Sequence, residues 1–218
     1  CVSIGGGRVI DSAKAATFLA RQRHSLAEFL EDDCLSAEPR QGELVAIPTT
    51  SGTGSEATHF SVVHLGPHKR SLARTEVIPE FYYLDPDLTA SLPLAQVAST
   101  GLDALCQAIE SLWSLSATTE SRFYARRSLR LSTRHLRYAV FAPTRRARAA
   151  MLLAAHYSGR AINVTKTTAP HALSYGIRKA TGLAHGFSVC LTFPEILQAT
   201  ISGLADRRCH ADVSWLRL

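Results

Sequence analysis

The spacing of apolar positions along the chain changes near Leu94. Before this residue, short apolar runs alternate with glycine-rich or polar stretches, which is typical of buried strands joined by loops. After it, apolar residues recur at helical spacing. We therefore predict an α/β part over residues 1–93 and an all-helical part over residues 94–218.

The individual elements follow from the same pattern. In the first part we predict one helix at 9–19 and strands at 1–4, 44–50, 59–65, 69–73 and from 81 onward. Residues 20–42 are mixed and polar, and we predict no element there. In the second part we predict helices at 94–116, 118–137, 144–162, 168–180 and 186–199.

One predicted helix, "TGLDALCQAIESLW" at 100–113, has a polar stripe beside its apolar face. Asp103 and Gln107 lie four positions apart, one above the other on a helix, and Glu110 continues the stripe. Such a stripe is either a solvated edge or a set of groups that point together at a ligand. The helix alone leaves both interpretations open.

Composition narrows the class of protein. With 218 residues, of which 46% are hydrophobic, the chain has enough material for one large domain or two modest ones. Much of the formal net charge of +6 comes from arginines spread over 122–148, which is typical of a solvated helix face rather than of a nucleic-acid site. No apolar run approaches the ~20 residues of a membrane span, so we expect no membrane contact.

The cysteines and the first residues add two expectations. Five cysteines without a CxxC pair suggest neither a disulfide framework nor a cysteine zinc site, and they fit a reducing compartment. The chain starts with "CVSIGGG", inside a predicted buried strand. We therefore expect a cytoplasmic protein, and we expect this sequence to be a piece of a longer one.

Two glycine-rich loops each follow a predicted strand. "SIGGGRVIDSAK" places glycines at a helix start, where free backbone N–H groups attract phosphate. "PTTSGTGSEAT" adds hydroxyls that can bond phosphate, ribose or carboxamide, although an ordinary polar connection has the same composition. Open α/β sheets bind ligands where such loops leave neighbouring strands. The candidate cofactor-binding residues are Gly6, Gly7, Thr49, Thr50, Thr53 and Ser55.

Two of the nine histidines stand at predicted helix starts. His171 follows Pro170, and His185 precedes Gly186. Histidines at the ends of facing helices can converge on one metal ion. An isolated histidine is more often a surface or core residue than a ligand, and most of the others fit that description.

Five segments occur in a fixed order: "GGGRVIDSAK", "PTTSGTGSE", "DPDLTASLP", "GLDALCQAIES" and "HALSYG…GLAHG". Their order and rough spacing resemble those of the iron-containing, group III alcohol dehydrogenases, over residues 2–197. The resemblance implies an incomplete Rossmann-like dinucleotide-binding domain at 1–93 and a truncated helical metal-binding domain at 94–218, in a dehydroquinate synthase-like architecture. Residues 198–218 have no match in the family pattern.

By this resemblance, the chain binds one divalent metal, Fe²⁺ or Zn²⁺. The positions that match the family's ligands are Asp103, Gln107, His171 and His185, and Gln107 stands in place of a family histidine. An amide oxygen binds such metals more weakly than an imidazole does. Tyr175 stands where the family commonly has a further histidine that assists proton transfer.

The resemblance also implies a nicotinamide cofactor, NAD or NADP. Lys69 matches a family lysine that approaches the cofactor. Asp11 matches a family aspartate near the nicotinamide ribose, although capping of its own helix is an equally good interpretation. Arg8 replaces the serine that usually follows the three glycines, which leaves the loop contacts open.

The implied activity is the NAD(P)H-linked reduction of a small aldehyde. "TKTTAPHALSY", Gln107 and "GTGSEATHF" look most like the phosphonoacetaldehyde reductases, which implies 2-hydroxyethylphosphonate as the product and phosphonate biosynthesis as the setting. Lys166, together with His59, is then the candidate for binding the phosphonate, although Lys166 also fits a solvated loop. We expect complete members to be homo-oligomers.

Other interpretations stay open on the sequence alone. The chain could be a truncated, non-catalytic remnant, or a general short-chain alcohol or glycerol dehydrogenase. A dehydroquinate synthase-like lyase fits less well, because such enzymes use a zinc ligand set different from Asp103, His171 and His185.

Overall fold

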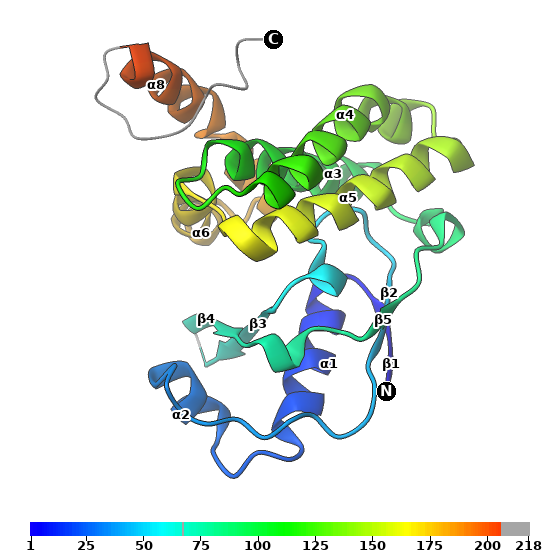
Figure 1. Cartoon of the computed structure of the whole chain (residues 1–218). Coiled ribbons are helices and arrows are strands. Elements are labelled where there is room, and N and C mark those ends of the chain that lie inside the picture. The colour runs from blue at the N-terminus through cyan, green and yellow to red at the C-terminus, as the bar shows by residue number, and fades with distance from the viewer. Residues whose placement is uncertain (67, 206–218) are drawn as a thin grey trace.

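The computed structural model describes residues 1–66 and 68–205 and consists of an α/β part and a helical part (Figure 1). Three parallel strands form one sheet in the order β1-β2-β5: β1 (Val2–Gly5), β2 (Val45–Pro48) and β5 (Phe81–Tyr82). A separate antiparallel hairpin joins β3 (Phe60–Leu65) to β4 (His68–Ala73). The parallel order brings the ends of β1 and β2 together, where the two glycine-rich loops begin.

Helix α1 (Gly7–Leu19) is the centre of the first part and contacts β1, β2 and β3. A short helix α2 (Leu26–Glu31) adds Phe29 to the core around Phe18. The sequence analysis missed α2, although Ser25 and Glu28 form a capping box at its start. That short signal lay within a polar stretch with too few apolar positions to show helical spacing.

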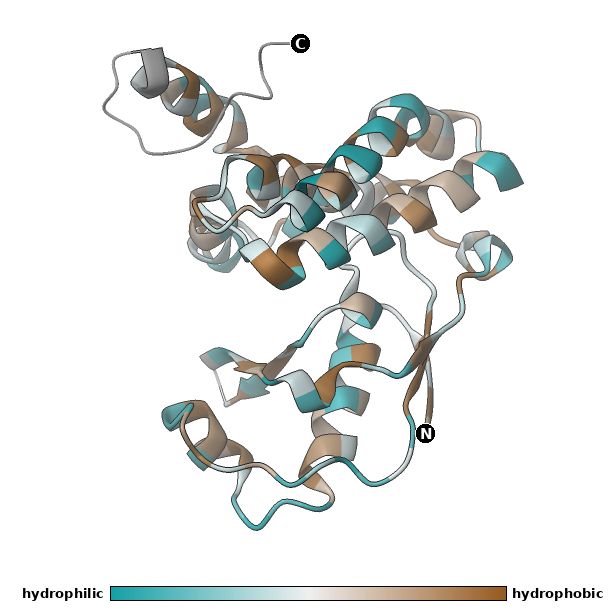
Figure 2. Cartoon of the chain, viewed as in Figure 1, coloured by the Kyte–Doolittle hydropathy of each residue, from teal (hydrophilic) through white to brown (hydrophobic). Residues whose placement is uncertain are grey.

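Apolar side chains remain exposed along the parallel sheet. Val2, Ile4 and Phe81 are all more than half exposed, whereas Ser3 and Ala46 are buried. Figure 2 shows these strands as a brown, apolar strip beside the N-terminus. Within the part of the chain that the structure describes, this side of the sheet therefore has no covering layer.

The second part is helical from Leu94 to the last described residue. Its long helices α3 (Leu94–Trp113), α4 (Thr119–Phe141) and α5 (Arg145–Thr165) pack closely on one another (Figure 1). Helices α6 (Ala169–Thr181), α7 (His185–Cys190) and α8 (Phe193–Ala205) follow. No described residue after Leu94 belongs to a strand, so the change from mixed to helical secondary structure occurs where the sequence predicted it. The division into domains 1–93 and 94–218 stays a prediction.

The structure corrects one predicted helix. The pattern predicted a single helix at 186–199, but α7 ends at Cys190 and α8 begins at Phe193. Pro194 has no N–H to donate to the carbonyl of Cys190, so a continuous helix would lose a hydrogen bond there. The chain also has three short 3₁₀ turns among its described residues: η1 (Ser55–Ala57), η2 (Thr75–Val77) and η3 (Pro86–Thr89).

The described helices include none that is both long and apolar enough to cross a membrane.

The glycine-rich loop after β2 packs directly on helix α5. Gly54 has a φ of +60°, and a Cβ there would lie 2.5 Å from the Cα of Gly159. Close by, Nδ1 of the His156 ring lies 3.2 Å from Oε1 of Glu56. Two glycines thus let backbone meet backbone, which fixes the loop against the helical part.

The fully buried Lys14 of α1 holds the same loop from the other side. Its Nζ donates to the carbonyl oxygens of Ser55 and Phe60 at 2.7 and 2.6 Å, and lies 3.1 Å from Oγ1 of Thr58. Burial lowers the pKa of Lys14 to about 8, although the charge of Asp11 opposes the shift. The ammonium is therefore a structural group that links α1 to the loop.

Replacing Lys14 by methionine tests this burial through the pH dependence of stability. Between the folded pKa of about 8 and the ordinary value of 10.5, the unfolded chain binds more protons at this residue than the folded protein. The free energy of unfolding of the parent protein should therefore rise by up to about 3 kcal/mol relative to Lys14→Met across this range. Urea denaturation from pH 7 to 10.5 measures the difference.

Lys179→Met removes an exposed lysine of α6 and is the matched control, for which we expect no such change with pH. Parallel stability curves for Lys14→Met and the parent would contradict the assignment of a buried charge to Lys14.

Candidate metal centre

The polar stripe of α3 is buried. Asp103, Gln107 and Glu110 are 3, 4 and 0% exposed, so the stripe is not a solvated edge. Buried acids need partners, because removing a carboxylate from water is costly unless hydrogen bonds or opposite charges replace the lost hydration. Helices α6 and α7 supply those partners.

Two histidines approach Asp103 from different helices. Nε2 of His171, in the first turn of α6, lies 3.0 Å from Oδ1 of Asp103, and Nε2 of His185, the first residue of α7, lies 3.9 Å from the same atom. One donor atom from each of the three residues falls within 4.8 Å of the others. One carboxylate and two imidazoles in this arrangement fit a divalent transition metal.

Glu110 fixes the orientation of His171. Its carboxylate contacts Nδ1 of His171 and also accepts from the backbone N–H and the hydroxyl of Thr168, the residue that precedes α6. Because Nδ1 is occupied, Nε2 is the nitrogen that faces Asp103. Carboxylates behind metal-binding histidines orient the ring in this way. The sequence analysis placed Glu110 on the stripe but gave it no function.

The carboxylates dominate the electrostatics of His171. Burial by itself would lower the pKa of this ring, but the hydrogen bonds to Asp103 and Glu110 raise it to about 9. Burial would likewise raise the pKa of Asp103, but the hydrogen bonds from His171 and Gln107 and the charges of His185 and His171 together outweigh it, so this pKa lies below its ordinary value. Two acids around one imidazole form a site that attracts positive charge.

Gln107 lies beside Asp103, with both ends of its amide in hydrogen bonds. Its Nε2 donates to Oδ1 of Asp103 at 3.1 Å, and its Oε1 accepts from the hydroxyl of Ser158 at 2.8 Å. That hydroxyl also lies 2.8 Å from the carbonyl oxygen of Ala155. If the amide turned over, Ser158 could accept from it and donate to Ala155, which would free the amide oxygen for a metal. Coordination by Gln107 stays a prediction.

A close contact between α7 and α3 places His185. A Cβ on Gly186 would lie 1.8 Å from the carbonyl oxygen of Ser99, and the N–H of Gly186 donates to the Ser99 hydroxyl at 3.1 Å. Any side chain at this position would push the start of α7 away from α3. Glycine is therefore required for His185 to reach Asp103.

Tyr175 and Lys69 extend the site toward the β3–β4 hairpin. The Tyr175 ring lies parallel to the ring of His185, at an interplanar angle of 6° and a centroid distance of 6.0 Å. Nζ of Lys69, on β4, lies 4.0 Å from the centroid of the Tyr175 ring. Tyr175 is 47% exposed, so part of the residue is open to solvent. The predicted role of Tyr175 in proton transfer stays a prediction.

The structure brings most of the predicted cofactor-binding residues together. The N–H of Thr49 donates to the carbonyl of Gly5, and a Cβ on Gly6 would lie 3.2 Å from the side chain of Thr50. A Cβ on Gly7 would lie 2.7 Å from the side chain of Thr53. The two glycine-rich loops thus lie side by side at the N-terminus of α1.

Asp11 and Ser55 face inward and bond to each other. The hydroxyl of Ser55 donates to the Asp11 carboxylate, and both residues are less than 10% exposed. Burial raises the pKa of Asp11, against the lowering effect of the Lys14 charge. Asp11 does not cap α1, whose first turn begins after Gly6. Cofactor contacts by Asp11 and Ser55 stay predictions.

Lys166 lies at the end of α5, in a left-handed conformation with a φ of +59° and with its side chain exposed. His59 is held by Asn163, whose Oδ1 lies 2.7 Å from Nδ1 of the ring. Burial lowers the pKa of His59, and the charge of Lys166 adds to that effect. A shared binding space for His59 and Lys166 stays a prediction. Binding of a phosphonate by Lys166 stays a prediction.

Two family profiles match the chain. The profile described as iron-containing alcohol dehydrogenase matches residues 1–86. The profile described as Fe-containing alcohol dehydrogenase family, C-terminal, matches residues 97–216, more than half of the chain. The first covers both glycine-rich loops, and the second covers Asp103, His171 and His185. The second also extends to residue 216, which corrects the expectation that residues 198–218 have no match in the family. Residues 206–218 lie outside those that the structure describes.

Curated relatives are similar over most of the chain. A phosphonoacetaldehyde reductase of Streptomyces viridochromogenes is 39% identical over 206 residues, which cover 90% of this chain and 52% of the relative. A long-chain-alcohol dehydrogenase 1 of Geobacillus thermodenitrificans is 34% identical over 198 residues, which cover 90% and 50%. The chain thus spans about half the length of these relatives.

Solved structures share the fold. A sulfoacetaldehyde reductase from Bifidobacterium kashiwanohense, in complex with NAD⁺, superposes with a TM-score of 0.85 at 33% identity, covering 91% of this chain and 54% of that one. An iron-containing alcohol dehydrogenase from Thermotoga maritima gives 0.82 at 32%, covering 92% and 55%. The predicted fold class, an α/β part followed by an all-helical part, is confirmed.

The first prediction for this site is a stoichiometric metal. Elemental analysis after dialysis should find close to one Zn²⁺ or Fe²⁺ per chain, and His171→Ala should lose it because one of three donors is gone. His24→Ala, which removes an exposed histidine, is the matched control and should keep the metal. Full metal retention in His171→Ala would show that the cation binds elsewhere.

The second prediction concerns Glu110. Glu110→Gln should weaken Zn²⁺ binding by about tenfold to a hundredfold, because the amide orients the His171 ring less strongly and supplies no charge. Competition with a chromogenic chelator measures the affinity, and circular dichroism checks that the helices persist. A Zn²⁺ affinity equal to that of the parent would mean that Glu110 serves only to hydrogen-bond Thr168 at the start of α6.

Proposed function

This chain belongs to the iron-containing alcohol dehydrogenase family, and we propose that the protein of which it forms part or all reduces a small aldehyde with NADH or NADPH. The observation that carries the proposal is the convergence of Asp103, His171 and His185 within 4.8 Å. The two glycine-rich loops, side by side at the N-terminus of α1, support a dinucleotide site in the same chain.

The three converging residues would hold the metal, Fe²⁺ or Zn²⁺, with Gln107 as a proposed fourth contact. Bound there, the cation would supply Lewis-acid polarisation of the aldehyde oxygen. Glu110 orients His171, and the contact of Gly186 with Ser99 sets the position of His185. The chain's own residues thus present donors of fixed geometry, which reduces the reorganisation needed during the reaction.

The cofactor would lie along the two loops. Free N–H groups at the start of α1 attract the diphosphate, and the hydroxyls of Thr50 and Thr53 stand next to Gly6 and Gly7, where they can bond its oxygens. Lys14 holds the second loop from behind, so the loop keeps its shape when a dinucleotide binds. The nicotinamide would supply hydride to the carbonyl carbon.

Tyr175 is the proposed source of the proton for the reduced oxygen. Its ring is stacked on His185, the residue is about half exposed, and the ammonium of Lys69 lies over its ring. A phenol in this position can donate a proton directly or through one water. The tyrosine replaces the histidine that the family resemblance leads one to expect, so proton transfer would not depend on a second imidazole.

The relatives point to an aldehyde that carries an anion. Phosphonoacetaldehyde and sulfoacetaldehyde, the substrates named for two of them, each have an acidic group on the carbon next to the carbonyl. We therefore propose phosphonoacetaldehyde as the substrate and 2-hydroxyethylphosphonate as the product, with a role in phosphonate biosynthesis. A general alcohol dehydrogenase would show no preference for a charged aldehyde.

The experiment that tests this function measures NADH and NADPH oxidation by the metal-loaded protein with phosphonoacetaldehyde and with acetaldehyde. We expect kcat/KM for the charged aldehyde to be at least about tenfold higher, because one charge-assisted contact contributes ~1.5–3 kcal/mol. Asp103→Asn removes one proposed metal donor and is the negative control, for which we expect no metal-dependent activity. Equal rates on both aldehydes would contradict the substrate, and no hydride transfer by the loaded protein would contradict the function.

A further inference from the structure

Two basic side chains belong to elements that border the metal centre. Lys69 comes from β4 and Arg178 from α6, and neither forms an ion pair with a carboxylate in the range 1–66 and 68–205. Lysine and arginine at a site with buried neighbours are usually paired, or they serve a ligand of opposite charge. Their geometry decides between these possibilities.

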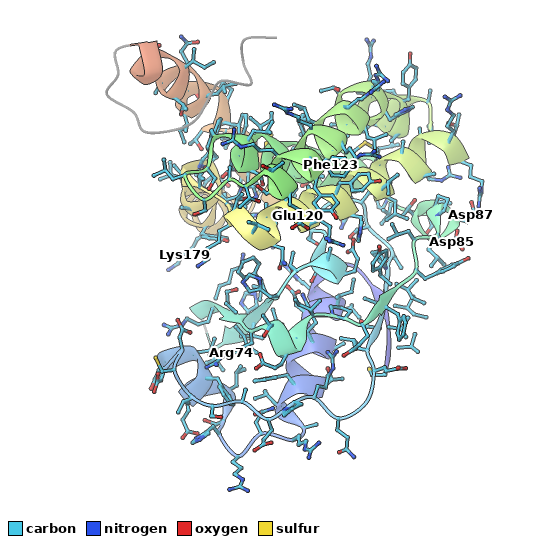
Figure 3. All side chains as sticks on the ribbon, viewed as in Figure 1. Arg74, Asp85, Asp87, Glu120, Phe123 and Lys179 are labelled. Carbon is cyan, nitrogen blue, oxygen red and sulfur yellow. The ribbon has the colours of Figure 1, made fainter. Side chains whose placement is uncertain are left out.

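Arg178 lies on the face of α6 that carries the metal donor. His171, Tyr175 and Arg178 are spaced by four and then three residues, which places their side chains along one stripe of the helix. Arg178 is half-buried, whereas the next residue, Lys179, is exposed. Figure 3 shows Lys179 at the end of α6, at the border between the helical part and the α/β part. Arg178 precedes Lys179 in sequence and lies on the stripe of α6 that carries His171 and Tyr175.

Lys69 reaches the same place from the opposite layer. Its ammonium lies 4.0 Å from the centroid of the Tyr175 ring, and the His185 ring is parallel to Tyr175 at a centroid distance of 6.0 Å. The ammonium, the phenol and the imidazole thus form a continuous stack from β4 to a metal donor. The cation–π contact holds Lys69 in position while leaving its N–H donors unused.

The charges of Lys69 and Arg178 act on each other. Burial and then the charge of Arg178 lower the pKa of Lys69, against the opposing charges of Asp103 and Asp11. An anion bound between the two cations would relieve their mutual repulsion.

We propose that Lys69 and Arg178 bind the phosphonate or sulfonate group of the aldehyde, with Tyr175 as the surface that holds Lys69 in place. The proposal rests on the proposed function. A tetrahedral oxyanion one carbon from the carbonyl must lie within a few Å of the metal-bound end of so small a molecule. Arginine suits three oxygens because its guanidinium donates two parallel N–H groups, and lysine adds a point charge.

This assignment differs from two sequence predictions, in which Lys69 approaches the cofactor and Lys166 binds the phosphonate. The ammonium of Lys69 lies over the Tyr175 ring, and that ring is parallel to the ring of the proposed metal donor His185. Lys166 is exposed at the end of α5. The contact of Lys69 with the Tyr175 ring is the reason to place the anion beside β4 and α6.

The experiment measures binding rather than turnover. Isothermal titration of the Zn²⁺-loaded protein, in the presence of NAD⁺, gives Kd for 2-hydroxyethylphosphonate and for 2-hydroxyethanesulfonate. Arg178→Gln and Lys69→Gln should each raise Kd about tenfold to a hundredfold. Arg178→Lys should recover part of the loss for Arg178→Gln, because charge returns without the planar pair of donors. The metal content of each variant is measured alongside.

Lys179→Gln is the matched control, since it removes the same charge at the next residue of α6, and it should change Kd by less than about twofold. Equal losses for Lys179→Gln and Arg178→Gln would overturn the proposal by showing a general effect of net charge. A loss confined to Lys166→Gln, or no binding of either anion to the parent protein, would also overturn it.

Different experimental results distinguish failure of this proposal from failure of the proposed function. If the loaded protein reduces acetaldehyde but Arg178→Gln binds both anions normally, the anion site is wrong and the reductase function stands. If Kd depends on Arg178 and Lys69 but no aldehyde is reduced, the anion site stands and the reductase function fails.

Discussion

The position of His171 between two buried carboxylates is the constraint on which the rest of the helical part depends. Asp103 contacts one ring nitrogen and Glu110 the other, and both acids lie on one helix, seven residues apart. Burying two carboxylates costs several kcal/mol each unless they are neutralised, so α3 is stable in this place only with α6 packed on it. A divalent cation among Asp103, His171 and His185 would complete the neutralisation.

Two close backbone contacts position the other parts of the site around His171. Gly186 lets α7 reach the backbone of Ser99, which puts His185 beside Asp103. Gly54 and Gly159 let the loop after β2 meet α5, a helix that packs on α3. The loop after β2 and the proposed metal donors are therefore fixed relative to one another by backbone packing, and the proposed hydride transfer between two bound groups would require that precision.

Much of the site could be predicted from the sequence, because its main residues stand at recognisable places. The helical stripe placed Asp103 and Gln107 together, and the helix starts at Pro170 and Gly186 marked His171 and His185. Glu110 and Lys14 act through contacts with residues more than 40 positions away, which no local pattern reveals. The sequence analysis did not single out Arg178, because its proposed role depends on residues of β4 that are distant in sequence. The break between α7 and α8 was missed because the apolar spacing continues through it.

X-ray absorption spectroscopy at the metal edge of the Zn²⁺-loaded chain tests the central claim most directly, because it reports the donor atoms themselves. The account predicts a first shell of light atoms at ~2.0–2.2 Å, with the multiple-scattering signature of two imidazoles and no sulfur. Cys106 and Cys190 lie in the core formed by α3, α7 and α8, so a sulfur shell near ~2.3 Å is a real alternative. A sulfur contribution, or an all-oxygen shell without imidazole, would contradict the assignment of the buried stripe as the metal centre.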